Sequence, residues 1–281
     1  MTSAFALALG AMVCLGLSDV VYKRGAAAGV RPHHFLMVQA WCFTPAILLY
    51  GLVTGTLEFE PYVLWGCGAG LFAFVALINF ARSLGGGSVS LIAPIFRLSF
   101  TVTTALAVMV LGEPLTAWKL AGLAAAFAAV WLLLGGGSVA AAPRRAAIMQ
   151  ALVAMAAMGV ANFFYKVGAQ AGGTPAAFIA GQAIVFLPLS TAYAWAVERE
   201  LKPPAAAWTH AGTTAALFLL GLVLLFESLA RGEASVLVPV SQMGFVVTAA
   251  YGVLWLREPF TARKGGGILF ALGALACLAI S

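Results

Sequence analysis

The sequence predicts an all-α integral membrane protein with ten transmembrane helices, arranged as two inverted five-helix repeats. Three observations predict this fold. The chain is 63% hydrophobic and only 9% charged, its apolar residues fall into ten long runs, and its second half repeats the first. A soluble domain has nearly half apolar and about a quarter charged residues. A chain of this composition therefore needs lipid as its solvent.

Each apolar run is long enough to cross a hydrocarbon core of roughly 30 Å, which takes about 20 helical residues. The runs are residues 4–22, 34–53, 62–82, 89–111, 116–134, 147–165, 176–196, 209–228, 234–256 and 264–280. They are continuous, unlike the alternating segments of about ten residues in a membrane β-barrel. The first run has no Lys or Arg before it and no A-x-A cleavage pattern, so we expect a retained span rather than a signal peptide.

The basic residues are scattered singly or in pairs among the loops, which argues against a nucleic-acid-binding face and favours a topology signal. When loops are assigned alternately to two sides, eleven basic residues share one side: Lys23, Arg24, Arg31, Arg82, Arg144, Arg145, Arg199, Lys202, Arg257, Arg263 and Lys264. Lys119, Lys166 and Arg231 lie on the other side. The positive-inside rule then makes the richer side cytoplasmic and places both termini outside.

An internal repeat covers most of the chain. An offset of 143 residues aligns Gly16 with Gly159, Tyr22-Lys23 with Tyr165-Lys166, Gly25 with Gly168 and Gln39 with Gln182. An offset of 145 aligns Ser83-Leu84 with Ser228-Leu229, Pro94 with Pro239, Glu113-Pro114 with Glu258-Pro259 and Lys119 with Lys264. We place the repeats at residues 1–138 and 146–281. Because each repeat has five spans, an odd number, the second enters the membrane from the opposite side.

Inverted repeats are typical of secondary transporters, which bind substrate near the bilayer midplane between the repeats and expose it to each side in turn. Two pairs of prolines fall at corresponding places within spans: Pro45 with Pro188, and Pro94 with Pro239. Proline removes a helical hydrogen bond, so these four residues are predicted hinges. Membrane helices also tolerate proline without such a role.

The segments L-G-E-P-L-T-A-W-K-L-A-G at 111–122 and L-R-E-P-F-T-A-R-K-G-G-G at 256–267 resemble the Glu-Pro turn between the fourth and fifth helices of EamA-type repeats. The chain thus resembles the ten-helix members of the drug/metabolite transporter superfamily. The resemblance implies secondary transport of a small metabolite, often outward, through a cavity lined by the first, third, fourth, sixth, eighth and ninth helices. It also implies cytoplasmic termini, against the charge distribution.

Ionisable residues inside spans are costly and mark functional sites by default. Three stand out, Asp19, Arg97 and Glu227, whose repeat partners Asn162, Gln242 and Arg82 carry different charges. Helical spacing places Tyr22 and Lys23 on the face of Asp19, and it places Thr101 and Thr104 on one stripe with Arg97. Lys23, one turn from Asp19, is an alternative partner that would neutralise its charge. The predicted substrate-binding residues are Arg97, Asp19, Tyr22, Lys23, Asn79, Asn162, Tyr165, Lys166, Glu227 and Gln242. Lys23 and Lys166 lie near span ends, where snorkelling to the headgroups is the alternative. Gln39 and Gln182 are expected to hydrogen-bond between helices instead.

These residues favour an exporter of an amino acid or a related zwitterion or organic anion. Arg97 would bind a carboxylate, and Glu227 or Asp19 would serve an ammonium group or a coupling proton. Two alternatives stay open: an exporter of hydrophobic cations or drugs that uses the carboxylates, and a lipid-interacting or assembly protein without solute flux.

No catalytic constellation is evident. His33 and His34 are adjacent, His210 stands alone, and the sequence has neither H-E-x-x-H nor a P-loop. The four cysteines sit in apolar runs without a C-x-x-C, so we expect buried thiols and no metal. We expect no enzyme activity, no cofactor and no nucleic acid. The expected partners are membrane lipid, a small-molecule substrate and a coupling proton, with the protein a monomer or homodimer in a bacterial cytoplasmic membrane.

Overall fold

A computed structural model of the chain describes residues 2–84, 89–134, 145–255 and 261–281. All regular secondary structure in these ranges is helical. The helices are α1 (Thr2–Ala27), α2 (Pro32–Thr54), α3 (Val63–Leu84), α4 (Val89–Arg97), α5 (Ser99–Leu111), α6 (Ala117–Leu134), α7 (Arg145–Gln170), α8 (Pro175–Glu198), α9 (Ala205–Arg231), α10 (Ala234–Gln242), α11 (Gly244–Leu254) and α12 (Ala262–Ala279).

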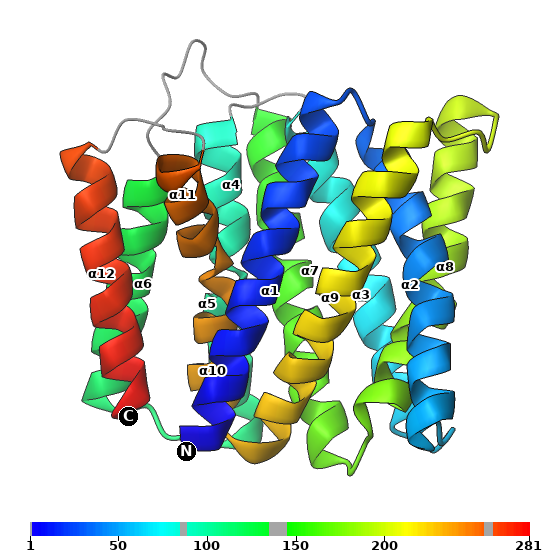
Figure 1. Cartoon of the computed structure of the whole chain (residues 1–281). Coiled ribbons are helices and arrows are strands. Elements are labelled where there is room, and N and C mark those ends of the chain that lie inside the picture. Colours follow the sequence, from blue (N-terminus) through cyan, green and yellow to red (C-terminus); the bar gives the residue numbers. More distant parts are fainter. Residues whose placement is uncertain (1, 85–88, 135–144, 256–260) are drawn as a thin grey trace.

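The described ranges contain ten helical segments long and apolar enough to cross a membrane, which confirms the predicted number of spans. Two of these spans are each made of two helices: α4 and α5 form the fourth, and α10 and α11 form the ninth. The helices run side by side, and both chain ends lie at the same end of the bundle (Figure 1). We call this end the termini face and the other end the far face.

The inverted repeat is visible in the packing. Helix α1 packs on α9 as α7 packs on α3, and α1 packs on α11 as α7 packs on α5. Helices α6 and α12 pair at one side of the bundle, and α2 and α8 pair at the opposite side (Figure 1). Each helix of one repeat therefore finds its partners largely in the other repeat, so neither half has a separate core.

Glycine allows the closest of these contacts. A Cβ atom added to Gly16 of α1 would lie 2.4 Å from the Gly244 carbonyl oxygen, and one added to Gly159 of α7 would lie 2.8 Å from the Ser99 oxygen. Thr103 donates a hydrogen bond to the Gly159 oxygen at 2.9 Å, and Thr248 donates to Gly16 at 3.2 Å. Small residues at such crossings let two backbones approach within membranes.

The four predicted hinge prolines have two different settings. Helices α2 and α8 continue through Pro45 and Pro188. The fourth and ninth spans break four residues after Pro94 and Pro239, at Leu98 and Met243. The residues just before the breaks are Arg97 and Gln242. Each lies eight residues into its span, from the far face in the first repeat and from the termini face in the second.

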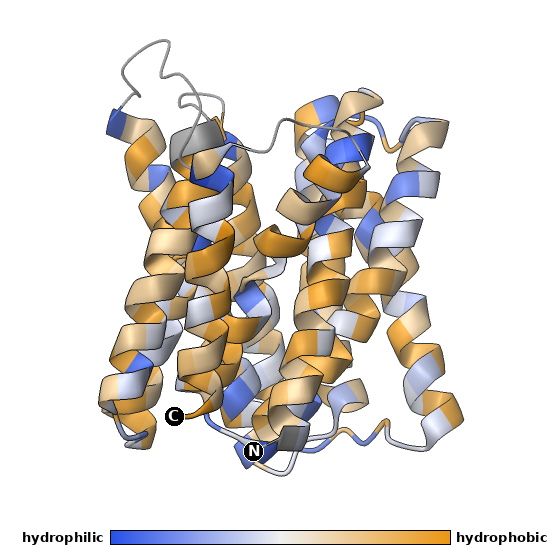
Figure 2. Cartoon of the chain, turned by 60° about the vertical axis from the view of Figure 1, so that its left-hand side comes forward, coloured by the Kyte–Doolittle hydropathy of each residue, from blue (hydrophilic) through white to orange (hydrophobic). Residues whose placement is uncertain are grey.

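The outer surface is apolar. Most of the helical ribbon in Figure 2 is coloured hydrophobic. Large apolar side chains such as Leu52, Leu64 and Leu269 are about 70% exposed on the helices, at 69%, 72% and 70%. Such a surface is stable only against lipid, which agrees with the ten spans.

Candidate substrate site

Arg97 and Asp19 form an ion pair inside the bundle. The Arg97 guanidinium, in the last residue of α4, donates a hydrogen bond to the carboxylate of Asp19 on α1. Asp19 is the only aspartate of the sequence. Each residue lies eight positions from the far-face end of its helix, a depth of about 12 Å at 1.5 Å per residue. The side chains keep 20% and 30% exposure, so the pair is partly accessible.

The second repeat has uncharged residues in the equivalent places. Asn162 on α7 corresponds to Asp19, and Gln242 at the end of α10 corresponds to Arg97. Asn162 is 6% exposed, and its side-chain nitrogen is among the buried polar atoms without a hydrogen-bond partner in the described part of the chain. The scaffold is therefore symmetric at these positions while its charge is confined to one half.

Beside the ion pair, each repeat contains the same aromatic and amide contacts. Tyr22 donates to the Gln39 side-chain oxygen and stacks on Phe35 at a ring distance of 3.9 Å. In the other repeat Tyr165 donates to Gln182 and contacts Phe178 at 4.7 Å. The prediction that Gln39 and Gln182 bond between helices is confirmed. The hydroxyl groups of Tyr22 and Tyr165, both predicted to bind substrate, are therefore already hydrogen-bonded to a neighbouring helix.

The two Tyr-Lys pairs, although identical in sequence, differ in burial. Tyr165 and Lys166 are only 3% and 7% exposed, whereas Tyr22 is half-buried and Lys23 is exposed. The Lys166 ammonium donates to the carbonyl oxygens of Leu229 at 2.9 Å and Gly232 at 2.6 Å, at the C-terminal end of α9. Lys166 therefore caps α9 at the termini face instead of reaching solvent.

Helix packing repeats this asymmetry. Helix α7 packs against α9, whereas the corresponding pair α1 and α3 is not packed in this way within the described ranges. A pocket of about 170 Å³ lies at the far face and is lined by Val20, Lys23, Arg24, Ala27, Thr248 and Tyr251. It begins one residue beyond Asp19 on α1. A larger pocket of about 420 Å³ lies at the termini face, between the start of α1, the start of α10 and the end of α12. The two faces thus differ in how α7 and α1 pack, and each has a pocket of its own.

A network of charges lies at the termini face, and sequence reasoning did not assign it a role in the site. The buried Lys119 ammonium pairs with the Glu233 carboxylate and donates to the Pro114 oxygen at 2.6 Å. The Glu113 carboxylate accepts hydrogen bonds from the backbone amides of Ala234 and Ser235, both at 2.8 Å. The signal was available, because Glu113 and Lys119 belong to the repeated Glu-Pro segment. Glu258, its counterpart, lies outside the described residues.

The remaining predicted residues lie apart from the ion pair or bond within their own helices. Glu227 pairs with Arg231 one turn along α9 at 2.7 Å. The Asn79 amide donates to the Val75 oxygen of its own helix at 2.8 Å. The expected stripe of Arg97, Thr101 and Thr104 does not form, because the helix breaks at Leu98; Thr101 is exposed and Thr104 is buried.

Comparison with known proteins agrees with this architecture. An uncharacterized protein of Methanocaldococcus jannaschii is 36% identical over 73 residues, which are 26% of this chain. The match covers 53% of that protein, so the chain spans about half the length of this curated relative. A crystal structure of another protein superposes with a TM-score of 0.83 at 16% identity, over 100% of this chain and 97% of the other. That likeness shows the same fold.

The EamA-like transporter family matches the chain twice, at residues 2–135 and 145–280. Each match contains five spans, so the family pattern accounts for both inverted repeats. The chain belongs to the EamA-like transporter family and is a membrane transporter of the drug/metabolite type.

Proposed function

We propose that this transporter is a secondary carrier that exports an amino acid or a related zwitterion. The observation that carries the proposal is the Asp19–Arg97 ion pair beside the break between α4 and α5. Transporter sites form where helices are interrupted near the midplane. A guanidinium is suited to binding a carboxylate, because its planar donors match the two carboxylate oxygens.

The pair explains why a zwitterion suits the site better than a simple cation. In the empty carrier, Asp19 and Arg97 neutralise each other, so no uncompensated charge is held at membrane depth. A zwitterion inserted between them replaces each half of the pair with a matching charge: its carboxylate binds Arg97 and its ammonium group binds Asp19. A hydrophobic cation would satisfy Asp19 but leave Arg97 unpaired.

Asp19 is also the residue proposed to carry a coupling proton. Protonation removes the carboxylate charge and releases Arg97 for the substrate carboxylate, so proton and substrate can be exchanged at one place. Glu227 is less suited to this role, because it is paired with Arg231 in the last turn of α9 at the termini face. An organic anion would use Arg97 with a protonated Asp19.

The test is a metabolite panel against purified protein, read as the shift in melting temperature, followed by counterflow in proteoliposomes with each stabilising compound. The informative variant is Asp19→Asn with Arg97→Gln, because the other repeat already holds Asn162 and Gln242 at the equivalent places and the fold should be kept. We expect this variant to lose both ligand stabilisation and counterflow. Arg82→Gln is the matched control, since the Arg82 guanidinium lies over the Tyr193 ring, 5.6 Å from its centroid, in the last turn of α3.

Full counterflow of the stabilising compound by Arg97→Ala would contradict the proposal. Stabilisation by lipophilic cations, abolished by Asp19→Asn alone, would support the cation exporter instead. A lack of stabilisation and flux with every amino acid and zwitterion tested would also contradict the proposal.

A further inference from the structure

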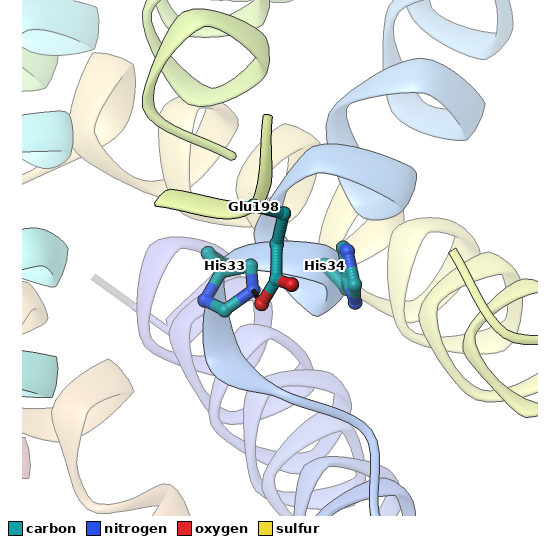
Figure 3. A group of neighbouring side chains, drawn as sticks. All are labelled: His33, His34 and Glu198. Atoms are coloured by element: carbon teal, nitrogen blue, oxygen red, sulfur yellow. Dashed lines mark hydrogen bonds and ion pairs between the residues drawn. The ribbon is translucent and has the colours of Figure 1, made fainter. Parts of the chain in front are cut away.

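A cluster of two histidines and a glutamate lies at the far face and is unused by the proposed transport cycle. His33 and His34 occupy the first turn of α2, and Glu198 is the last residue of α8. Figure 3 shows the two imidazole rings on either side of the Glu198 carboxylate. One ligand atom from each of the three side chains lies within 4.8 Å of the others.

The three side chains already lie close to one another. The His33 Nε2 atom lies 2.7 Å from a Glu198 carboxylate oxygen. The His33 and His34 rings are 4.6 Å apart between centroids, at an angle of 65°. Adjacent residues of a helix normally point in different directions, yet here both rings reach the same carboxylate from the first turn of α2.

His34 is the unusual member of the cluster. The residue is only 8% exposed, and within the described part of the chain its ring takes part in no hydrogen bond. Its ring nitrogens are not among the fully buried unpaired atoms of the described residues, so they keep some contact with solvent and are available to a metal ion. A neutral imidazole nitrogen facing a second imidazole and a carboxylate is a metal-ligand arrangement.

The donor set indicates which metals would bind. Two imidazole nitrogens and one carboxylate oxygen, with water as the fourth ligand, form a known type of tetrahedral zinc site. Ligand bonds of about 2.0 to 2.1 Å place neighbouring ligand atoms about 3.4 Å apart, so the present spacing needs only small side-chain rotations. Mg²⁺ prefers six oxygen ligands and would be a poor match.

Arg31 is the competitor for this site. Its guanidinium forms an ion pair with the same Glu198 carboxylate oxygen that contacts His33. The Arg31 side chain is 64% exposed, so it can leave Glu198 for solvent when a cation arrives. The other nearby charges are engaged elsewhere: Lys202 pairs with Glu200, and the Arg199 guanidinium lies over the Trp195 ring at 5.1 Å.

We propose that His33, His34 and Glu198 bind a divalent transition-metal ion, Zn²⁺ by their ligand chemistry, which displaces Arg31 and ties α2 to α8. Helix α2 belongs to the first repeat and α8 to the second. The bound ion cross-links the two repeats at the far face and stabilises the folded transporter there. The site is independent of the transported solute.

The experiment measures zinc binding to detergent-solubilised full-length protein from which any affinity tag has been removed. Calorimetric titration with ZnCl₂ gives the affinity, and the melting temperature is followed with and without EDTA. Wild type should bind one Zn²⁺ and melt at a higher temperature, reversibly, with no response to Mg²⁺. His34→Ala and Glu198→Gln should each weaken binding about tenfold or more, since each removes a ligand.

Two further variants make the test specific. Arg31→Ala removes the competing guanidinium and should tighten zinc binding. If Glu198 serves only to pair with Arg31, neither wild type nor Arg31→Ala should bind zinc. His210→Ala is the matched control, because the His210 ring contacts the Ala206 oxygen of its own helix at 2.8 Å and should leave zinc binding unchanged. Unchanged affinity in His34→Ala, or absence of zinc binding in wild type, would overturn the proposal.

Discussion

The Glu113 carboxylate of the first repeat accepts a hydrogen bond from the backbone amide of Ala234, the first residue of α10 in the second repeat, at 2.8 Å. Its other oxygen accepts from the Ser235 amide at the same distance. The first amides of a helix have no partner within the helix, and a negative charge there also complements the helix dipole. The glutamate of the Glu-Pro segment is therefore a helix cap supplied by the opposite repeat.

We predict that Glu113→Ala lowers the free energy of unfolding by about 2 kcal/mol, because it leaves two buried amides without acceptors. Thermal unfolding in detergent measures the change. Glu60→Ala is the control, since Glu60 is exposed in the loop before α3 and should have little effect. An equal loss of stability in both variants would mean that the cap contributes nothing of its own.

Close backbone contact at Gly16 yields the second prediction. Gly16→Ala would place a Cβ atom 2.4 Å from the Gly244 oxygen, so α1 and α11 must separate. Forced overpacking costs about 1 to 3 kcal/mol, which a thermal melt would report. In Gly273→Ala the added Cβ meets nothing within 4 Å on α12, and stability should stay the same or rise slightly. A harmless Gly16→Ala would show that the two helices are not packed this closely.

Much of this fold could be predicted because the length of each apolar run and the internal repeat are visible in the sequence itself. The ten runs and the inverted repeat are confirmed by the structure and by the family matches. The pairing of Asp19 is different: helical spacing pointed to Lys23 one turn away, but the structure pairs Asp19 with Arg97, 78 residues distant. A contact between two spans of one repeat depends on how the spans pack, which spacing within one helix does not encode.

The helix faces were the weakest part of the prediction for the same reason. Pro94 indicated an interruption of the fourth span, yet the stripe through Arg97 and Thr101 assumed a continuous helix. Likewise, Lys166 lies near a span end, where snorkelling is the simple expectation, but its ammonium group turns to the end of α9. The break in the fourth span and the position of the Lys166 ammonium group both depend on packing between helices.

The contact of Lys166 with the end of α9 predicts that a substitution of Lys166 opens the termini face. The ammonium group makes two charge-assisted hydrogen bonds to the end of α9. Lys166→Met removes them and should loosen the termini face, raising accessibility there about tenfold. A reporter cysteine at Ser235, which is fully buried at the start of α10, measures this by its rate of thiol labelling in a background without the four native cysteines.

Lys23→Met is the control for this prediction, since Lys23 occupies the equivalent position at the far face and should leave labelling at residue 235 unchanged. Equal labelling of all three proteins would mean that Lys166 does not hold the termini face closed.

The Asp19–Arg97 pair should show strong energetic coupling. Each single variant, Asp19→Asn or Arg97→Gln, leaves one charge without its partner inside the bundle and should lower the free energy of unfolding by about 3 kcal/mol. The double variant removes both charges and reproduces the Asn162 and Gln242 arrangement of the second repeat, so it should be more stable than either single variant. A double-mutant cycle from reversible unfolding in detergent gives the coupling energy. Additive losses would mean that the two charges do not stabilise each other, and the carboxylate and ammonium groups of a zwitterion would then have no preformed pair to replace.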